Sequence, residues 1–277
     1  MDNNLLLDDD ILELQGIDEA RAEKWDHYLY DGKGVPRVSH ILAQCRDSEW
    51  LIQWAANIGR RKYDYYRDKA LTIGTIVHEI IDEYLKIKYN VPTPGFVYMN
   101  KVYEVDYTAI DDVYRESVFN CVENFKVWDR HLEEVGAHID EIIGFEIPIQ
   151  CPWYGGTIDW MVRINGAVYI CDFKTSKSIS PEYLMQAASY MWIVNNGYAP
   201  GLPHVDGIGI IRVEKTRRDV LNDLFVNDFI PEQHQMIEAY QRCFAVYLES
   251  FYRTINIEYL TKNYNYNPDT IFEKGNK

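Results

Sequence analysis

The sequence predicts a mixed α/β fold, in which helices flank a central mixed β-sheet. Three observations support this prediction. Helical periodicity dominates the first half of the chain, short runs rich in Ile and Val fill the middle, and helix, strand and helix then follow in turn. Asn165-Gly166 separates two of the short runs and marks an antiparallel hairpin. Elements mixed in this way pack as layers around a hydrophobic core.

The chain of 277 residues contains no internal repeat and no low-complexity linker, so we expect one domain over residues 1–277. It divides into a helical lead over 1–35, a core over 36–215, and a helical segment with a tail over 216–277. Apolar residues make up 47% of the chain and charged residues 26%, which favours a folded protein over a disordered one.

The first half of the chain is predicted to be mainly helical. After an acidic lead we expect a short helix, a glycine turn at Asp31–Gly34, and helices over 47–69, 72–89 and 107–134. Thr72 would cap the second of these long helices, because a Thr side chain accepts a hydrogen bond from a free N–H group of the first turn.

Strands are expected over 141–150, 156–164, 167–173 and 205–213. Ser180 and Pro181 begin a helix that reaches Asn195. Ser is a favoured cap, and Pro suits the first helical position because its missing N–H needs no partner there. A last long helix is expected from Pro231 to about Tyr252.

The formal net charge of −15 argues against a general nucleic-acid binder, because phosphate binding depends on Lys and Arg. Two local stretches are basic: Arg60, Arg61, Lys62, Arg67 and Lys69, and then Arg212, Lys215, Arg217 and Arg218. Their simpler interpretation is a solvated face. They bear on function only if the fold brings them beside a site.

No apolar run approaches the roughly 18 residues that span a bilayer. The acidic N-terminus lacks the basic region of a signal peptide. The five cysteines are scattered and include no CxxC pair, as is typical of a reduced intracellular protein. We therefore expect a cytoplasmic protein without membrane contact.

The two-residue turn determines which residues of the hairpin face each other. Counting outward from it places Asp159 opposite Asp172, in the class of pairs whose Cα atoms lie about 4.5 Å apart. Lys174 lies two residues beyond Asp172 and shares its face. The other face is expected to be core and carries Ile158, Trp160, Val162, Tyr169, Cys171 and Phe173.

Two facing carboxylates repel, and burial forces one of them to bind a proton or a cation. Mg²⁺ or Mn²⁺ reverses the repulsion, because both ions prefer hard oxygen ligands. The simpler alternative is an exposed salt bridge between Asp172 and Lys174 with an incidental second Asp. The juxtaposition of Asp159 with Asp172 favours the metal site.

Several segments also carry a family resemblance: PRVSHIL at 36–42 before a Trp-containing helix, GTIVHEIIDEYL at 74–85, GTIDW at 156–160, DFKTSK at 172–177, and QAASY at 186–190. Together they resemble the PD-(D/E)XK nuclease superfamily, in its RecB-like and phage-type exonuclease branch. The resemblance covers roughly residues 35–195. It implies a restriction-endonuclease-like core.

The resemblance implies a role for each matching residue. His78, Asp159 and Asp172 would bind the metal, and the backbone carbonyl of Phe173 would complete its shell. Asp159, Asp172 and Lys174 would form the catalytic set. Lys174 would orient the attacking water and stabilise the charge of the transition state.

Gln186 and Tyr190 share one helix face and would contact DNA or support the site. Their plainer interpretation is a face packed against the sheet, and that of His78 is a structural histidine. Glu146, on the strand before the hairpin, is a further candidate metal ligand, although strand Glu residues are more often exposed. Asp82 lies one turn after His78.

The activity implied is that of a divalent-metal-dependent deoxyribonuclease, an exonuclease that hydrolyses linear DNA in phage or mobile-element recombination or replication. The cofactor would be Mg²⁺ or Mn²⁺, and the partners DNA and a single-strand annealing or binding protein. Only Cys243 follows the motifs, so no iron–sulfur cluster is expected. The acidic charge suggests a confined basic groove, or a toroidal homo-oligomer with acidic outer surfaces.

Two other functions stay open. The first is a non-catalytic or structure-specific DNA-binding member of the same fold. The second is an unrelated hydrolase or carbohydrate-binding protein, in which Trp153 and Trp160 line a sugar cleft. The predicted inward direction of Trp160 disfavours this second function.

Overall fold

A five-stranded mixed sheet in the order β3-β4-β5-β6-β7 forms the centre of the computed structural model, which describes residues 28–44, 49–91, 105–216 and 223–264. The strands are β3 (Ile139–Gln150), β4 (Gly155–Ile164), β5 (Ala167–Lys174), β6 (Gly207–Arg212) and β7 (Asp223–Asn227). β5 and β6 are parallel, and the other neighbours are antiparallel. The predicted mixed α/β fold is therefore confirmed.

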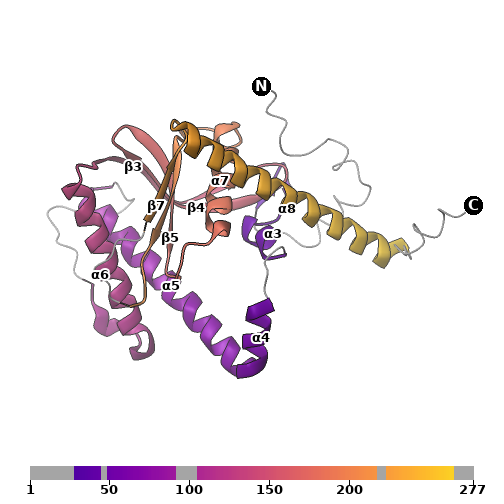
Figure 1. Cartoon of the computed structure of the whole chain (residues 1–277), viewed down its shortest axis with the longest axis horizontal. Helices are drawn as coiled ribbons and strands as arrows, with labels where there is room; N and C mark the ends of the chain where they lie inside the picture. The colour runs from indigo at the N-terminus through magenta and orange to yellow at the C-terminus, as the bar shows by residue number, and fades with distance from the viewer. Residues whose placement is uncertain (1–27, 45–48, 92–104, 217–222, 265–277) are drawn as a thin grey trace, which may run out of the picture.

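Helices cover both faces of this sheet (Figure 1). The helices of the described residues are α3 (Val38–Gln44), α4 (Glu49–Ile58), α5 (Arg60–Lys88), α6 (Asp112–Glu134), α7 (Pro181–Asn195) and α8 (Pro231–Tyr264). α5 and α6 pack on one face, while α3, α7 and α8 pack on the other. None of the helices in the described ranges is long and apolar enough to cross a bilayer.

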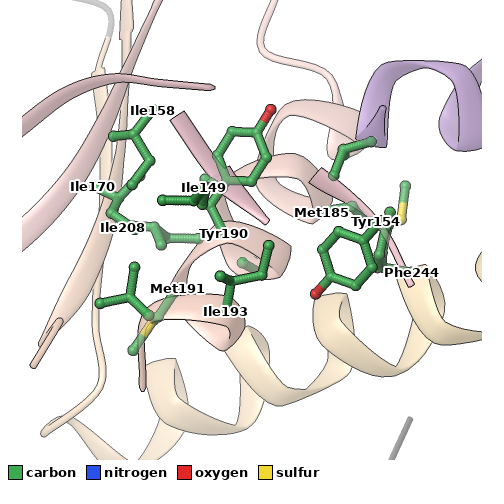
Figure 2. Close-up of a cluster of buried hydrophobic side chains, with 14 of the residues drawn as sticks. Ile149, Tyr154, Ile158, Ile170, Met185, Tyr190, Met191, Ile193, Ile208 and Phe244 are labelled. Atoms are coloured by element: carbon green, nitrogen blue, oxygen red, sulfur yellow. The ribbon is translucent and has the colours of Figure 1, made fainter. Parts of the chain in front are cut away.

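Each face of the sheet has its own hydrophobic cluster. Ile158, Ile170 and Ile208 of the sheet lie with Tyr190 and Met191 of α7 in the first cluster (Figure 2). All five side chains are at least nine-tenths buried. Because this face is covered, the hairpin face that carries Asp159 and Asp172 is mostly core rather than open surface.

The second cluster lies between the sheet and α5 and α6. There the fully buried Trp160 stacks on Phe145 and on Phe173. The prediction that Ile158 shares this face was wrong, because Ile158 belongs to the first cluster. Side chains no longer alternate strictly between the two faces of the sheet near Glu146, whose φ is a left-handed 47°. Beyond this residue the side chains of β3 and of its partner β4 point to the opposite face from the one that strict alternation predicts.

The boundary between the first two long helices was also predicted at the wrong place. Thr72 is not a cap, because α5 runs through it and its hydroxyl donates to the Asp68 carbonyl oxygen at 2.9 Å. The break lies at Gly59, whose φ of 79° ends α4. A left-handed φ at a helix end is tolerated best by Gly, since it has no Cβ.

Other boundaries agree with the prediction more closely. The Ser180 hydroxyl accepts from the Glu182 N–H at the start of α7, as expected. The helix expected over 107–134 begins as a single 3₁₀ turn at Tyr107–Ala109, and α6 starts at Asp112 after the Asp111 cap. The strand expected over 205–213 is the shorter β6, and α8 continues well past Tyr252.

The short edge strand β7 was not predicted. At the other end of the chain, β1 (Leu29–Tyr30) and β2 (Lys33–Gly34) enclose the expected glycine turn, in which Asp31 and Gly32 both have positive φ. The short helix expected before this turn lies outside the described residues.

Candidate metal centre

The Asn165-Gly166 turn holds together the two strands that carry most of the site. Both residues have positive φ, 48° and 81°, as a type I′ turn requires. The pairing of β4 with β5 keeps the predicted register from Ile164–Ala167 at the turn to Trp160–Cys171 next to the site. One further step places Asp159 beside Asp172, close enough for each carboxyl group to shift the pKa of the other.

A third carboxylate, that of Glu146 in β3, lies on the other side of Asp159. The pairing of β3 with β4 on both sides of this position puts Glu146 opposite Asp159. Glu146, Asp159 and Asp172 thus form a row across three neighbouring strands. The left-handed backbone of Glu146 costs on the order of 1–3 kcal/mol in a non-glycine residue, and such strain often marks a functional site.

His78 reaches this row from α5. Its Nε2 lies 2.8 Å from the Phe173 carbonyl oxygen. Because a carbonyl oxygen can only accept, the proton of this hydrogen bond belongs to Nε2. Burial lowers the pKa of His78, although Asp172 and the Phe173 carbonyl oppose the shift. The neutral ring therefore keeps a free lone pair on Nδ1.

That lone pair faces a carboxylate. Nδ1 of His78 lies 3.6 Å from Oδ2 of Asp159. Two electron-rich atoms repel at this distance unless a proton or a cation lies between them. One ligand atom each from His78, Glu146 and Asp159 can be chosen so that all lie within 4.8 Å of one another.

This geometry fits a divalent cation. Two ligands at about 2.1 Å from a shared ion lie up to roughly 4 Å apart, so the three groups need to move little to share one. Carboxylate oxygens dominate the set, which suits Mg²⁺ or Mn²⁺. A metal-binding His commonly donates its other N–H to a backbone carbonyl, as His78 does here to Phe173.

A buried ion pair completes the site. Nζ of Lys174 lies 2.5 Å from Oδ2 of Asp172 and 5.0 Å from the centre of the Tyr183 ring. Burial raises the pKa of Asp172 to about 7, against the lowering effect of Lys174. Burial also raises the pKa of Asp159. Burial lowers the pKa of Lys174, but both carboxylates outweigh it, so this side chain stays charged.

The structure thus brings together four of the predicted residues, His78, Asp159, Asp172 and Lys174. It also brings in Glu146. The resemblance had assigned the Phe173 carbonyl to the metal shell, and here this oxygen accepts the His78 N–H instead.

Gln186 and Tyr190 lie on α7 beside the hairpin. Nε2 of Gln186 donates to the Tyr190 hydroxyl at 3.0 Å. Tyr190 is only 5% exposed and lies so close to Gly156 that a Cβ added there would come within 2.3 Å of the ring. Of its two expected roles, this burial favours support of the site over contact with DNA.

Two residues near the site were not assigned a role from the sequence. The Tyr183 ring lies under the Lys174 ammonium. The only sequence signal that could have identified Tyr183 is its position one helical turn before Gln186. Asp82 is buried one turn after His78. Burial raises the pKa of Asp82 to about 7; Lys86 lowers it, and Glu146 adds to the rise. The acidic environment therefore extends along α5.

The sugar-cleft alternative does not fit these contacts. Trp160 is fully buried in the second cluster. Trp153 packs its ring against Trp192 and Tyr198. The two indoles therefore do not line a common open cleft.

Comparison with known proteins adds little to this geometry. No protein-family model matches the chain, and no curated protein matches it. Among solved structures, SSO0001 is 11% identical, with 61% of this chain and 87% of that chain covered and a TM-score of 0.23. A similarity this low carries no argument about fold or function, so the site rests on its own residues.

Proposed function

We propose that the chain is a divalent-metal-dependent deoxyribonuclease of the PD-(D/E)XK type that degrades linear DNA from its ends. The observation that carries this proposal is the convergence of His78, Glu146 and Asp159 beside the Asp172–Lys174 ion pair. The order of hairpin, α7 and parallel strand β6 along the chain supports a restriction-endonuclease-like core.

His78, Glu146 and Asp159 would hold Mg²⁺ or Mn²⁺, and Asp172 would join them once ionised. The bound cation would lower the pKa of a water molecule and offset the charge of the scissile phosphate. The hydrogen bond to Phe173 holds the His78 ring with Nδ1 toward the carboxylates.

Lys174 provides the second positive charge of the site. Asp172 and the Tyr183 ring hold its ammonium in place, so it can orient a water molecule and stabilise phosphate charge without first reorganising. Only 19% of this side chain is exposed, and burial strengthens its electrostatic effect on a phosphate.

The remaining parts of the proposal rest on the sequence resemblance alone. They are the preference for DNA ends, a role in phage or mobile-element recombination or replication, a cytoplasmic location, and a single-strand annealing or binding protein as partner.

The direct test is digestion of end-labelled linear duplex, linear single-stranded DNA and closed circular DNA with Mg²⁺, Mn²⁺ or EDTA. Linear DNA should be lost only with a metal, and circles should survive. Equal loss of circles would refute the exonuclease, and no metal-dependent loss of any DNA would refute the nuclease.

Variants with matched controls locate the activity. Asp159→Asn and Lys174→Ala should each lower the rate by at least about 100-fold. Asp112→Asn at an exposed position and Lys126→Ala at a partly exposed one, both on α6, should leave it unchanged. Wild-type protein that binds DNA but cleaves no better than Asp159→Asn would favour the non-catalytic alternative.

The role of Glu146 as a metal ligand is tested against a control substitution in the same strand, β3. Glu146→Gln should lower the rate about 10- to 100-fold if this carboxylate holds the metal. The control is Glu141→Gln, which removes an exposed carboxylate five residues earlier in β3.

A further inference from the structure

The sheet supports α5 only in its second half. α4 and the first turns of α5 extend away from the sheet as an arm (Figure 1). We define the α4–α5 arm as α4 together with α5 as far as Lys69. The same continuous helix carries His78 at its sheet-bound end. Any ligand of the arm is therefore held in fixed relation to the metal centre.

Aromatic rings gather on this arm and stay exposed. Trp54 is 37% exposed, Tyr65 52% and Tyr66 50%. The Trp54 and Tyr66 ring centres are 6.1 Å apart, and those of Tyr65 and Tyr66 are 5.4 Å apart. Large side chains that could pack into a core instead present their surfaces to solvent, which is typical of an interaction surface.

The arm is basic in an acidic protein. Residues 60–69 carry five basic and two acidic side chains, a net charge of +3 against −15 for the whole chain. Among the described residues, the exposed Arg61 and Lys62 have no carboxylate partner. Such a reversal of local charge favours a polyanionic ligand.

The basic and aromatic side chains alternate along the helix surface. Arg61, Tyr65 and Lys69 follow one another at intervals of four residues, and Lys62 and Tyr66 form a second row beside them. This interleaving offers rings for bases and cations for phosphates within the same few turns.

The fold adds charge from a distant segment at the base of the arm. Lys215, which follows β6, belongs to the second basic stretch of the sequence. Burial lowers the pKa of Lys215, and the nearby ammonium of Lys69 lowers it further. Lys215 therefore adds to the positive potential near Lys69. Arg217 and Arg218 lie outside the described residues.

Arg67 lies on the arm on the side that leads to the metal centre. It is eleven residues before His78, which is about three helical turns, so both side chains lie on the same face of α5 roughly 16 Å apart. Arg67 pairs with Asp64 and Asp68, but these carboxylates are exposed and such pairs are weak. A phosphate can therefore replace them.

We infer that the α4–α5 arm binds single-stranded nucleic acid and directs it toward the metal centre. Bases stack on exposed rings only when they are unpaired, so these rings select a single strand over a duplex. The inference rests on the proposed nuclease function and adds the strandedness of its substrate.

The test is binding of a fluorescent oligothymidylate of about 20 nucleotides, measured by anisotropy in EDTA so that no cleavage occurs. Alanine at Tyr65 or Tyr66 should weaken binding roughly 5- to 150-fold, the range of base-stacking losses. Tyr66→Phe keeps the ring and should bind as wild type. Phe229→Ala removes a ring that is 65% exposed outside the arm and should change nothing.

Charge and strandedness are tested in the same assay. Arg61→Gln with Lys62→Gln should flatten the plot of log affinity against log salt by about 0.7 for each phosphate that these two cations neutralise in the wild type. A matched duplex should bind more weakly and respond little to loss of the rings. Equal affinity for duplex and single strand, or unchanged binding by the alanine variants, would overturn the inference.

The outcomes separate this inference from the proposed function. Metal-dependent cleavage together with unimpaired oligonucleotide binding by the alanine variants would support the proposed nuclease activity and refute binding by the α4–α5 arm. Oligonucleotide binding that depends on the tyrosine rings, without cleavage by the wild type, would support binding by the α4–α5 arm and refute the proposed nuclease activity. Self-association of the wild type that Tyr66→Ala abolishes, without oligonucleotide binding, would make the arm an interface between copies and refute the inference.

Discussion

The raised pKa of Asp172 predicts that metal affinity depends on pH. Because burial raises the pKa of Asp172 to about 7, this carboxyl group is mostly protonated at pH 6 and mostly ionised at pH 8. A cation competes with that proton, so Mn²⁺ should bind more tightly as pH rises through 7. Without metal, the same shift makes the free energy of unfolding fall as pH rises from the unfolded-state pKa of Asp172 to its folded-state pKa. Over this range only the folded state still holds the proton.

The magnitude follows from the ionised fraction. With a pKa of about 7, the ionised fraction falls about tenfold from pH 8 to pH 6. A tenfold loss of affinity corresponds to about 1.4 kcal/mol of metal-dependent stabilisation at saturating metal. For a chain of this size, that is a difference of roughly 3 °C in the melting-temperature rise produced by Mn²⁺.

Thermal unfolding with and without Mn²⁺ at pH 6, 7 and 8 measures this effect, and calorimetric titration gives the affinities directly. Asp172→Asn removes this titrating group, so its residual response to Mn²⁺ should vary less with pH than the response of the wild type. Glu141→Gln should behave as wild type. Equal Mn²⁺ stabilisation at pH 6 and pH 8 in the wild type, or a larger one at pH 6, would refute the reasoning.

Three further substitutions test the packing that positions the site. Gly156→Ala should lower the free energy of unfolding in urea by about 1–3 kcal/mol, because the new methyl group would collide with the Tyr190 ring. Lys88→Ala should cost about 3–5 kcal/mol in the same titration, because it removes the ammonium 2.7 Å from the buried Asp129 carboxylate. Trp160→Ala should cost about 3–5 kcal/mol, seen as a lower melting temperature, because it empties a fully buried indole site.

Each of these results has a contrary outcome. Lys126→Ala breaks a more exposed ion pair with Glu123 and should cost less than about 1 kcal/mol, so equal losses at positions 88 and 126 would contradict the argument from burial. An unchanged urea midpoint for Gly156→Ala would mean that the Tyr190 ring moves away freely. A melting temperature unchanged by Trp160→Ala would contradict the packing of the second cluster.

Local structure was predicted best where chemistry within a few residues decides it. Asn165-Gly166 tolerates the two positive φ angles of a type I′ turn, and this turn sets the register that brings Asp159 to Asp172. Ser180 and Pro181 marked the start of α7 for the same kind of reason. The break between the first two long helices lies at Gly59 and not at Thr72, the predicted cap, because Thr can also bond back to a carbonyl inside a helix.

The sequence by itself determined the hairpin, its register, and therefore a pair of carboxylates with Lys174 two residues further along the strand. The family resemblance proposed His78 and left Glu146 open as metal ligands, and only the tertiary structure decided that both lie beside that pair, since β3 pairing and the packing of α5 bring them from distant parts of the chain. It also decided that Ile158 leaves the Trp160 face, because the left-handed backbone at Glu146 interrupts the alternation on which a sequence pattern depends. Hydrogen bonds within a turn act over a few residues, whereas packing and strand pairing between distant segments form only in the folded chain.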